Sequence, residues 1–254
     1  MARKTIAQVR EEFQAATLQA LPAFVCTYET DSRAGVQKLV AQAKKQMEKM
    51  EAERARVYKM GEYERQYAQY TYVCGVDEAG RGPLAGPVVA GAVILPKDCE
   101  ILYINDSKKL SADLREQLFD VIMEQAVAAG IGIVPQQRID EVNILNATYE
   151  AMRQAINNLG IIPDILLNDA VTIPGISMRQ VPIIKGDAKS SSIAAASILA
   201  KVTRDHMMQE YDSRYPGYGF AAHKGYGTKE HMQALRQQGP CDIHRKTFLK
   251  FLSE

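Results

Sequence analysis

The chain has 254 residues, 46% of them hydrophobic, and its 31 basic and 30 acidic residues give a formal net charge of +1. A chain of this size and composition can bury one large core, or one core with a small appendage. The near-neutral charge excludes bulk attraction to nucleic acid, so a polyanionic partner would need a local basic patch.

The apolar runs of the chain are too short to cross a membrane. Residues 88–95 and 161–167 fall below the roughly 18 consecutive apolar residues of a spanning helix. The amino terminus becomes charged before the apolar core of a signal peptide could form. The four cysteines include no Cys-x-x-Cys pair, which is typical of thiols in a reducing compartment. We therefore expect a cytoplasmic protein with no membrane contact.

Residues 1–70 are rich in charge and have the apolar spacing of helices. From Val36 to Met50 apolar residues recur at helical intervals, with lysines at positions 38, 44, 45 and 49 among them. This pattern predicts a small helical accessory module over residues 1–70. The lysines favour a solvated helix face, and contact with a nucleic-acid backbone is the alternative.

From residue 71 strands and helices alternate, which predicts the main domain over residues 71–254. Apolar, valine-rich runs predict strands at 71–76, 87–95, 131–134, 164–168 and 181–185. Helix-forming content predicts helices at 111–129, 140–159 and 190–211. Early hairpins followed by strand-helix-strand crossovers indicate an α/β fold with a mixed five-stranded sheet.

A glycine-rich loop with two acids at its start follows the first predicted strand. It reads Asp77-Glu78-Ala-Gly80-Arg81-Gly82-Pro83. Backbone N–H groups exposed by glycine, with an arginine among them, suit an anionic ester. Adjacent carboxylates suit hard divalent cations such as Mg2+. The loop therefore predicts metal-assisted phosphodiester chemistry.

Three aspartates, Asp77, Asp169 and Asp187, each come at the carboxyl end of a predicted strand. Because ligands gather outside those ends in α/β sheets, we expect the three to converge. Glu78 joins them only if the backbone turns there, since adjacent strand residues point to opposite faces. The glycines that follow permit such a turn.

Clustered acids require cations. Two unit charges about 4 Å apart repel by about 4 kcal/mol at an effective dielectric of about 20, so an unneutralised cluster would be destabilising or partly protonated. Two cations astride a phosphorus would activate water on one side and stabilise the leaving oxygen on the other, which is nuclease chemistry. If the acids do not converge, each is an ordinary turn or N-cap aspartate.

Several ordered motifs resemble bacterial ribonuclease HII from about residue 70 to the carboxyl terminus. They are Asp77-Glu78-Ala-Gly80-Arg81-Gly82-Pro83, Asn105-Asp-Ser107-Lys108-Lys109-Leu110, Lys185-Gly186-Asp187-Ala-Lys189-Ser190 and His223-Lys224-Gly-Tyr226-Gly-Thr228. The resemblance implies an RNase H-like fold, with helices flanking the sheet, and endonucleolytic cleavage of RNA in RNA-DNA hybrids. It also implies cleavage on the 5' side of a single ribonucleotide embedded in duplex DNA, leaving 5'-phosphate and 3'-hydroxyl ends. We expect the protein to act as a monomer.

Carried over by motif, the four acids resemble the ligands of two Mg2+ or Mn2+ ions; they are Asp77, Glu78, Asp169 and Asp187. Asp169 follows Asn168, where the family more often has an apolar residue. The change should not remove the ligand, because adjacent strand residues point to opposite faces.

The glycine loop, Gly80, Arg81 and Gly82, resembles the family loop that senses the ribose 2'-hydroxyl. Glycine lets the backbone approach the sugar closely, and the 2'-hydroxyl is what separates RNA from DNA. Tyr226 resembles the tyrosine that packs beside the deoxyribose after the ribonucleotide and favours an RNA-to-DNA junction. The alternative is a half-buried aromatic residue in a glycine-rich loop.

Polar residues outside the acids are expected to hold backbone phosphates. Asn105, Ser107 and Lys108 suit that role, with a helix-capping turn as the alternative. A looser basic set, part of which should face the duplex, comprises Lys189, Lys201, Arg204 and Lys224. Asp205, four residues after Lys201, is expected to be its ion-pair partner. The histidines have no metal-ligand spacing.

Two other classes of protein stay open at this point. A phosphotransferase of the sugar-kinase type also joins an acidic strand end to a glycine loop, but the chain has no phosphate-loop signature. A duplex-binding module would use the basic residues and keep the acids structural. It would bind without Mg2+-dependent cleavage.

Overall fold

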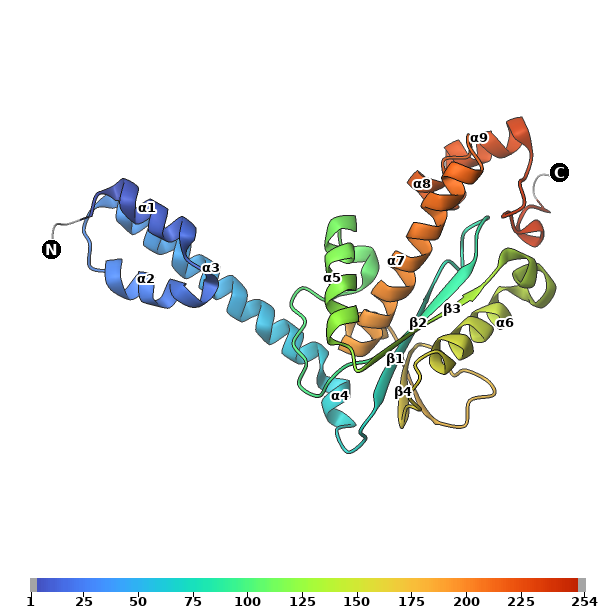
Figure 1. Ribbon diagram of the computed structural model, residues 1–254, viewed down its shortest axis with the longest axis horizontal. Helices are drawn as coiled ribbons and strands as arrows, with labels where there is room; N and C mark the ends of the chain where they lie inside the picture. The colour runs from blue at the N-terminus through green and yellow to red at the C-terminus, as the bar shows by residue number, and fades with distance from the viewer. Residues whose placement is uncertain (1–3, 251–254) are drawn as a thin grey trace. The chain divides into compact units, whose positions relative to one another are not determined.

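The computed structural model describes residues 4–250, and the sheet has the strand order β3-β2-β1-β4-β5. The strands are β1 (Val73–Ala79), β2 (Val88–Ile94), β3 (Ala128–Val134), β4 (Ile165–Asp169) and β5 (Arg179–Ile183). β2 lies antiparallel to β1 and β3, whereas β4 lies parallel to β1 and β5. The mixed five-stranded sheet expected from the sequence is confirmed (Figure 1).

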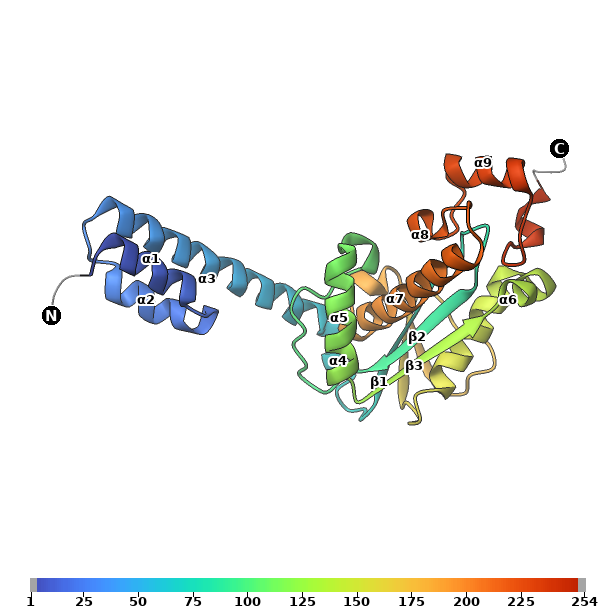
Figure 2. The same cartoon turned by 45° about the horizontal axis from the view of Figure 1, so that its top comes forward.

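Two long helices, α6 (Gln136–Asn157) and α7 (Ser191–Arg214), cover opposite faces of the sheet (Figure 2). Glycines in the strands allow them to approach closely. A Cβ at Gly132 would lie 1.9 Å from the carbonyl oxygen of Ala151 in α6, and one at Gly91 would lie 2.4 Å from that of Ala196 in α7. Real Cβ atoms do not approach so closely, so each helix rests on backbone at these points.

Shorter helices complete the main part of the chain. They are α4 (Glu62–Gln66), α5 (Ala112–Gln125), α8 (Phe220–His223) and α9 (Lys229–Gln238). Side-chain caps begin several of them, as the Ser111 hydroxyl does for α5 and the Ser190 hydroxyl for α7. The core under α6 is aliphatic and includes Val76, Ala90 and Leu166.

Some element boundaries differ from those expected. β1 runs through Asp77 and Glu78 in continuous register with β2, beyond the expected end at residue 76, so the backbone does not turn at Glu78. α6 begins at Gln136, before the expected residue 140, and Asn143 interrupts it with a φ of 67°. Asn tolerates this left-handed conformation because its side chain can hydrogen-bond locally, and here the Asn143 carbonyl oxygen Oδ1 accepts from the Asn146 N–H.

The amino-terminal part of the chain forms a compact unit that ends at Tyr58. It contains α1 (Ile6–Ala15), α2 (Leu21–Tyr28) and the greater part of α3 (Ala34–Met60). Its core joins Val9, Phe24 and Val40. Lysines 38, 44, 45 and 49 are exposed on α3.

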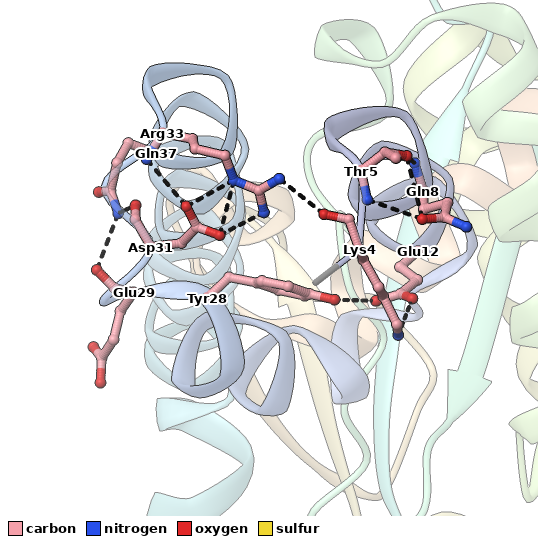
Figure 3. Close-up of polar contacts among 9 residues, drawn as sticks. All are labelled: Lys4, Thr5, Gln8, Glu12, Tyr28, Glu29, Asp31, Arg33 and Gln37. Carbon is pink, nitrogen blue, oxygen red and sulfur yellow. Dashed lines mark hydrogen bonds and ion pairs between the residues drawn. The ribbon is translucent and has the colours of Figure 1, made fainter. Parts of the chain in front are cut away.

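Polar contacts tie the start of this unit to α2 and to the segment between α2 and α3 (Figure 3). Arg33 bonds the Asp31 carboxylate and also donates to the Lys4 carbonyl oxygen at 2.8 Å. Tyr28 donates to the Glu12 carboxylate, which also pairs with Lys4. The unit therefore has both an apolar core and its own polar network.

In residues 4–250 we find no helix long and apolar enough to span a membrane.

Candidate active site

Asp77, Asp169 and Asp187 converge at one end of the sheet. One carboxylate oxygen of each lies within 4.8 Å of those of the other two. Asp77 lies in β1 and Asp169 ends the parallel neighbour β4. Asp187 lies in a short 3-10 helix, Gly186–Ala188, just after β5. The convergence expected from the strand ends is therefore present in the fold.

Backbone and hydroxyl groups orient these carboxylates. The Gly186 N–H donates to Asp169 Oδ1 at 2.7 Å, and the Glu78 N–H donates to Asp77 Oδ1 at 2.7 Å. Ser197 of α7 also hydrogen-bonds the Asp77 side chain. These bonds hold the trio in place before any ligand arrives.

Burial and repulsion between acids raise the pKa values of Asp77 and Asp187. Burial is the main reason that the pKa of Asp77 lies well above its usual value, and repulsion from Glu78 and Asp169 adds to it. Burial also raises the pKa of Asp187 to about 6, with Asp106 the next contributor. Both effects disfavour the charged form. A divalent cation would reverse them, because oxygen ligands of this kind suit Mg2+ and Mn2+.

Glu78 is not part of this trio. In β1 it pairs with Ala90, which in turn pairs with Gly132, the residue that faces α6. Asp77 pairs with Gly91, which faces α7. The two acids therefore start from opposite faces of the sheet.

The Glu78 carboxylate instead meets the glycine loop. Its Oε1 accepts a hydrogen bond from Arg81 Nη1 at 3.1 Å. Burial still raises the pKa of Glu78, although the Arg81 charge opposes the rise. Asp169 is close enough to contribute to the same rise. Glu78 thus lies beside the trio without joining it.

The segment from Asn105 to Lys109 borders the trio, and it includes an acid that the sequence did not single out. Asp106 interacts with Asp187 and caps a short 3-10 helix by accepting from the Lys108 N–H at 2.9 Å. Burial lowers the pKa of Lys108. Attraction to Asp77, Asp106 and Asp187 raises it by a larger amount, so the net change is upward. The Lys108 ammonium therefore sits in the field of the acids. Asp106 was missed because Asp in a turn is ordinarily a cap.

Ser107 lies deeper than its predicted phosphate-contacting role suggests. It is only 3% exposed, and its hydroxyl bonds that of Ser197 at 2.9 Å. Ser197 in turn bonds Asp77. Ser107 thus stands behind the acids, whereas Asn105 is half-buried and Lys189 is exposed.

The glycine loop is backed by two buried arginines. Arg204 was placed among basic residues that might face a duplex, and this is wrong: it is 1% exposed and donates to the Ala85, Pro87 and Lys224 carbonyl oxygens. Arg245, which no sequence pattern singled out, is 0% exposed and donates to the Gly80 and Arg81 carbonyl oxygens.

Tyr226 lies beside the glycine loop and is 46% exposed. A Cβ at Gly82 would meet the Tyr226 ring at 3.7 Å, which is ordinary van der Waals contact. Gly82 is therefore next to an accessible aromatic ring. Lys201 bonds Asp205 at 2.6 Å, which confirms the expected ion pair. His206 pairs with Glu116 on the exposed surface.

Comparisons with known proteins agree with this geometry. The family model described as "Ribonuclease HII" matches residues 74–251, and that described as "Ribonuclease HII N-terminal domain" matches residues 5–68. A relative named ribonuclease HII from Lachnoclostridium phytofermentans is 63% identical over 226 residues, 89% of each chain. One of the same name from Bacillus subtilis is 50% identical over 246 residues, 96% of each chain.

Solved structures give the same result for the main part of the chain. The ribonuclease H2 of Pyrococcus horikoshii superposes with a TM-score of 0.59 at 31% identity, over 69% of this chain and 93% of that one. These matches favour a nuclease over both alternatives, the sugar-kinase-like phosphotransferase and the binding module without catalysis.

Proposed function

The chain belongs to the ribonuclease HII family, and on that premise we propose that it cuts duplex DNA on the 5' side of a single embedded ribonucleotide. Membership gives the coarser activity: the protein is a divalent-metal-dependent nuclease that acts on RNA-DNA hybrids. The finer proposal is that cleavage leaves 5'-phosphate and 3'-hydroxyl ends. Duplex DNA containing ribonucleotides is then a substrate alongside the hybrid.

One observation carries this proposal: Asp77 of the acid trio and the glycine loop proposed to contact the sugar belong to one short segment. Asp77 belongs to the trio, and Gly80 to Gly82 follow it within five residues of chain. A phosphate held at the acids therefore has its sugar next to exposed backbone and the Tyr226 ring. Chemistry and ribose recognition would occur on neighbouring atoms of one nucleotide.

The donor set fits two divalent cations. Asp77, Asp169 and Asp187 would hold them, because the three carboxylates converge and burial raises the pKa values of Asp77 and Asp187, which a cation would reverse. When bound, such cations lower the pKa of an attacking water and neutralise the leaving 3'-oxygen. The chain itself would hold the acids rigid through Gly186, Glu78 and Ser197, so little reorganisation accompanies the reaction.

Glu78 is proposed as the fourth ligand. It would exchange its bond to Arg81 for a cation when nucleic acid draws the Arg81 side chain away. The Arg81 side chain is 45% exposed, so a phosphate can compete for it. The raised pKa of Glu78, caused chiefly by burial, also favours gaining a stronger positive partner.

The sugar contacts would discriminate in two ways. Backbone groups of Gly80, Arg81 and Gly82 would bond the ribose 2'-hydroxyl, so a deoxyribonucleotide loses that bond. The Tyr226 ring would pack on the next sugar and exclude a hydroxyl there, which favours an RNA-to-DNA junction.

Phosphates flanking the ribonucleotide would be held by a few polar side chains. Asn105, Lys108 and Lys189 are proposed contacts, because they are at least partly accessible. Ser107 is proposed to contribute indirectly, because its hydroxyl bonds that of Ser197, which in turn bonds Asp77.

The protein is proposed to act as a monomer, which light scattering during size-exclusion chromatography would test.

The direct test is cleavage of an end-labelled DNA duplex that carries one ribonucleotide, with Mg2+ or Mn2+ present. We expect one product cut on the 5' side of the ribonucleotide, with a 3'-hydroxyl that a polymerase extends. An all-DNA duplex of the same sequence is the control and should stay intact. Cleavage on the 3' side, or a 2',3'-cyclic end, would reject the proposed chemistry.

A further inference from the structure

The segment from Cys241 to Arg245 lies directly against the glycine loop. The Gly86 N–H donates to the Ile243 carbonyl oxygen at 2.8 Å, and the Arg245 N–H donates to that of Leu84 at 2.9 Å. Ala85 and His244 form an isolated antiparallel bridge between these bonds. Backbone pairing thus fixes where the side chains of His244 and Arg245 begin.

Arg245 spends its hydrogen bonds on the backbone of the glycine loop. Its guanidinium donates to the Gly80 oxygen at 2.5 Å, Arg81 at 2.9 Å, Gly86 at 3.0 Å and Pro87 at 3.2 Å. The Phe248 ring lies 5.2 Å from the guanidinium carbon. Burial lowers the pKa of Arg245 to about 9, so the group stays charged at neutral pH. A guanidinium with five N–H donors in a planar fork is suited to reaching several carbonyl groups at once.

These bonds determine which way the loop's N–H groups point. In a trans peptide the carbonyl of one residue and the N–H of the next point in opposite directions. Because Arg245 draws the Gly80 and Arg81 carbonyls inward, the N–H groups of Arg81 and Gly82 point away from Arg245. Both residues are exposed. Donors at the loop surface are what a ribose hydroxyl oxygen would accept from.

His244 reaches the Tyr226 loop through a second histidine. The Cys241 N–H lies 2.9 Å from His244 Nδ1, His244 Nε2 lies 3.0 Å from His231 Nε2, and His231 Nδ1 lies 2.9 Å from the Tyr226 carbonyl oxygen. The backbone groups at the two ends set the tautomers. The Tyr226 carbonyl oxygen can only accept, so His231 carries its proton on Nδ1. The Cys241 N–H donates to His244 Nδ1, so His244 carries its proton on Nε2.

We infer that His244 and Arg245 are positioning residues for sugar recognition: Arg245 aims the Arg81 and Gly82 N–H groups at the ribose, and His244, through His231, holds the Tyr226 loop. The inference rests on the proposed function. Neither side chain touches substrate, since both are buried, at 3% and 0% exposed. Two adjacent residues would therefore set both halves of the selection for a ribonucleotide followed by a deoxyribonucleotide.

The Arg245 arm is tested by binding in EDTA, where cleavage cannot occur. The affinity for a duplex with one ribonucleotide is compared with that for the same all-DNA duplex. Arg245→Lys should lose roughly tenfold of the preference for the ribonucleotide, about the value of one hydrogen bond. Arg153→Lys is the control: it makes the same change to an arginine that donates to the Pro174 carbonyl oxygen and not to the glycine loop. It should keep the sugar preference even if total affinity falls.

The His244 arm is tested by the substrate ratio in Mg2+. The ratio compares kcat/KM for a single-ribonucleotide duplex with that for a continuous RNA-DNA hybrid lacking a junction. His244→Phe should lower this ratio about tenfold, and His244→Gln, whose amide can still donate toward His231, should restore most of it. His206→Phe on the exposed surface should leave the ratio unchanged.

The outcomes separate the inference from the proposed function. If the wild-type protein neither prefers nor cuts the ribonucleotide duplex, the proposed function fails. If it does both, while folded Arg245→Lys keeps the full sugar preference and His244→Phe the full ratio, the positioning inference fails. Should Arg245→Lys fail to fold, the His244→Phe and His244→Gln pair decides. Equal loss in both His244 variants on all substrates would show a merely structural role and overturn the inference.

Discussion

Asp77 and Glu78 are adjacent in the chain, yet the fold gives them different surroundings. Asp77 points to the face of the sheet that α7 covers, where it lies near Ser197 and the other two aspartates of the trio. Glu78 starts from the α6 face and meets Arg81. The two acids are therefore not equivalent: Asp77 is fixed in the trio, whereas Glu78 is bound to Arg81 and is proposed to be released when a ligand competes for Arg81.

Replacing Asp77 by Asn tests the fixed acid. Cleavage should fall by roughly 10³-fold or more, because metal-ion stabilisation of the transition state is worth several kcal/mol. Duplex binding should persist. The melting temperature without metal should rise, since the change removes a buried charge whose pKa is raised by burial and by its acidic neighbours.

Calorimetry and single-turnover kinetics measure both effects, with exposed Asp120→Asn as the control. Mg2+ should raise the melting temperature of the wild type and the control but not that of Asp77→Asn. Near-normal cleavage by Asp77→Asn would remove this residue from the metal centre.

The buried histidine pair gives a pH dependence of stability. Burial and the neighbouring His231 lower the pKa of His244 to about 4, from an ordinary value of 6.5. The folded state thus favours neutral His244. Its contribution is fully present above pH 6.5 and is lost as the pH falls toward 4. Urea denaturation should show the free energy of unfolding decreasing over that window.

Two substitutions separate this effect from general acid sensitivity. His244→Gln should flatten the profile between pH 6.5 and 4, because Gln does not titrate. The exposed His206→Gln should keep the wild-type slope. Parallel profiles for wild type and His244→Gln would contradict the assignment to His244.

At the scale of elements, the junction before α7 depends on an acid from α4. Glu64 Oε1 accepts from the Ser190 hydroxyl at 2.6 Å, the Ser192 hydroxyl at 2.6 Å and the Ser192 N–H at 2.9 Å. A carboxylate at a helix N-terminus is also favoured by the helix dipole. Since Asp187 lies three residues before Ser190, Glu64 helps to place one member of the acid trio.

Truncation at two positions tests this role. A chain beginning at Lys59 keeps Glu64, whereas a chain beginning at Thr71 loses it. We expect the longer chain to have a cleavage rate and a melting temperature at least as high as those of the full-length Glu64→Gln variant. The shorter chain and full-length Glu64→Ala should both lose stability by roughly 1–3 kcal/mol, because buried hydroxyls lose their acceptor. Equal cleavage rates and melting temperatures for the two truncated chains would contradict this role of Glu64.

Sequence patterns predicted the elements better than their side-chain directions. Strand ends at Asp77, Asp169 and Asp187 could be predicted from apolar runs followed by polar residues, so their convergence followed from sheet topology. The continuation of β1 past Asp77 could not, because its cause is register with β2. The kink at Asn143 was also invisible, since helical content continues on both sides of it.

Buried arginines were the main feature beyond prediction in the site. Arg is mostly exposed unless paired, so Arg204 was expected near a duplex and Arg245 drew no attention. Their actual partners are carbonyl oxygens of a loop far away in the sequence. Only the fold brings a carboxyl-terminal residue against the loop after β1. Arg245 follows Ile243 and His244, which are also buried, but their burial is a property of the fold and not of the sequence.

At the scale of the whole molecule, the amino-terminal unit has its own core and polar network, and it matches its own family model at residues 5–68. The acids proposed as metal ligands and the loop proposed to contact the sugar all belong to the main unit. The proposed metal centre therefore lies wholly in the main unit, where β1, β4 and the turn after β5 bring the three aspartates together.

The most direct measurement is an anomalous-scattering map from crystals of the wild-type protein soaked in Mn2+. The account predicts a Mn2+ peak bonded to carboxylate oxygens of Asp77 and at least one of Asp169 and Asp187, at about 2.1–2.2 Å. The same soak of Asp77→Asn crystals should give a much weaker peak. Saturating Mn2+ with no peak at these carboxylates, or with ions bound only elsewhere, would contradict the central claim.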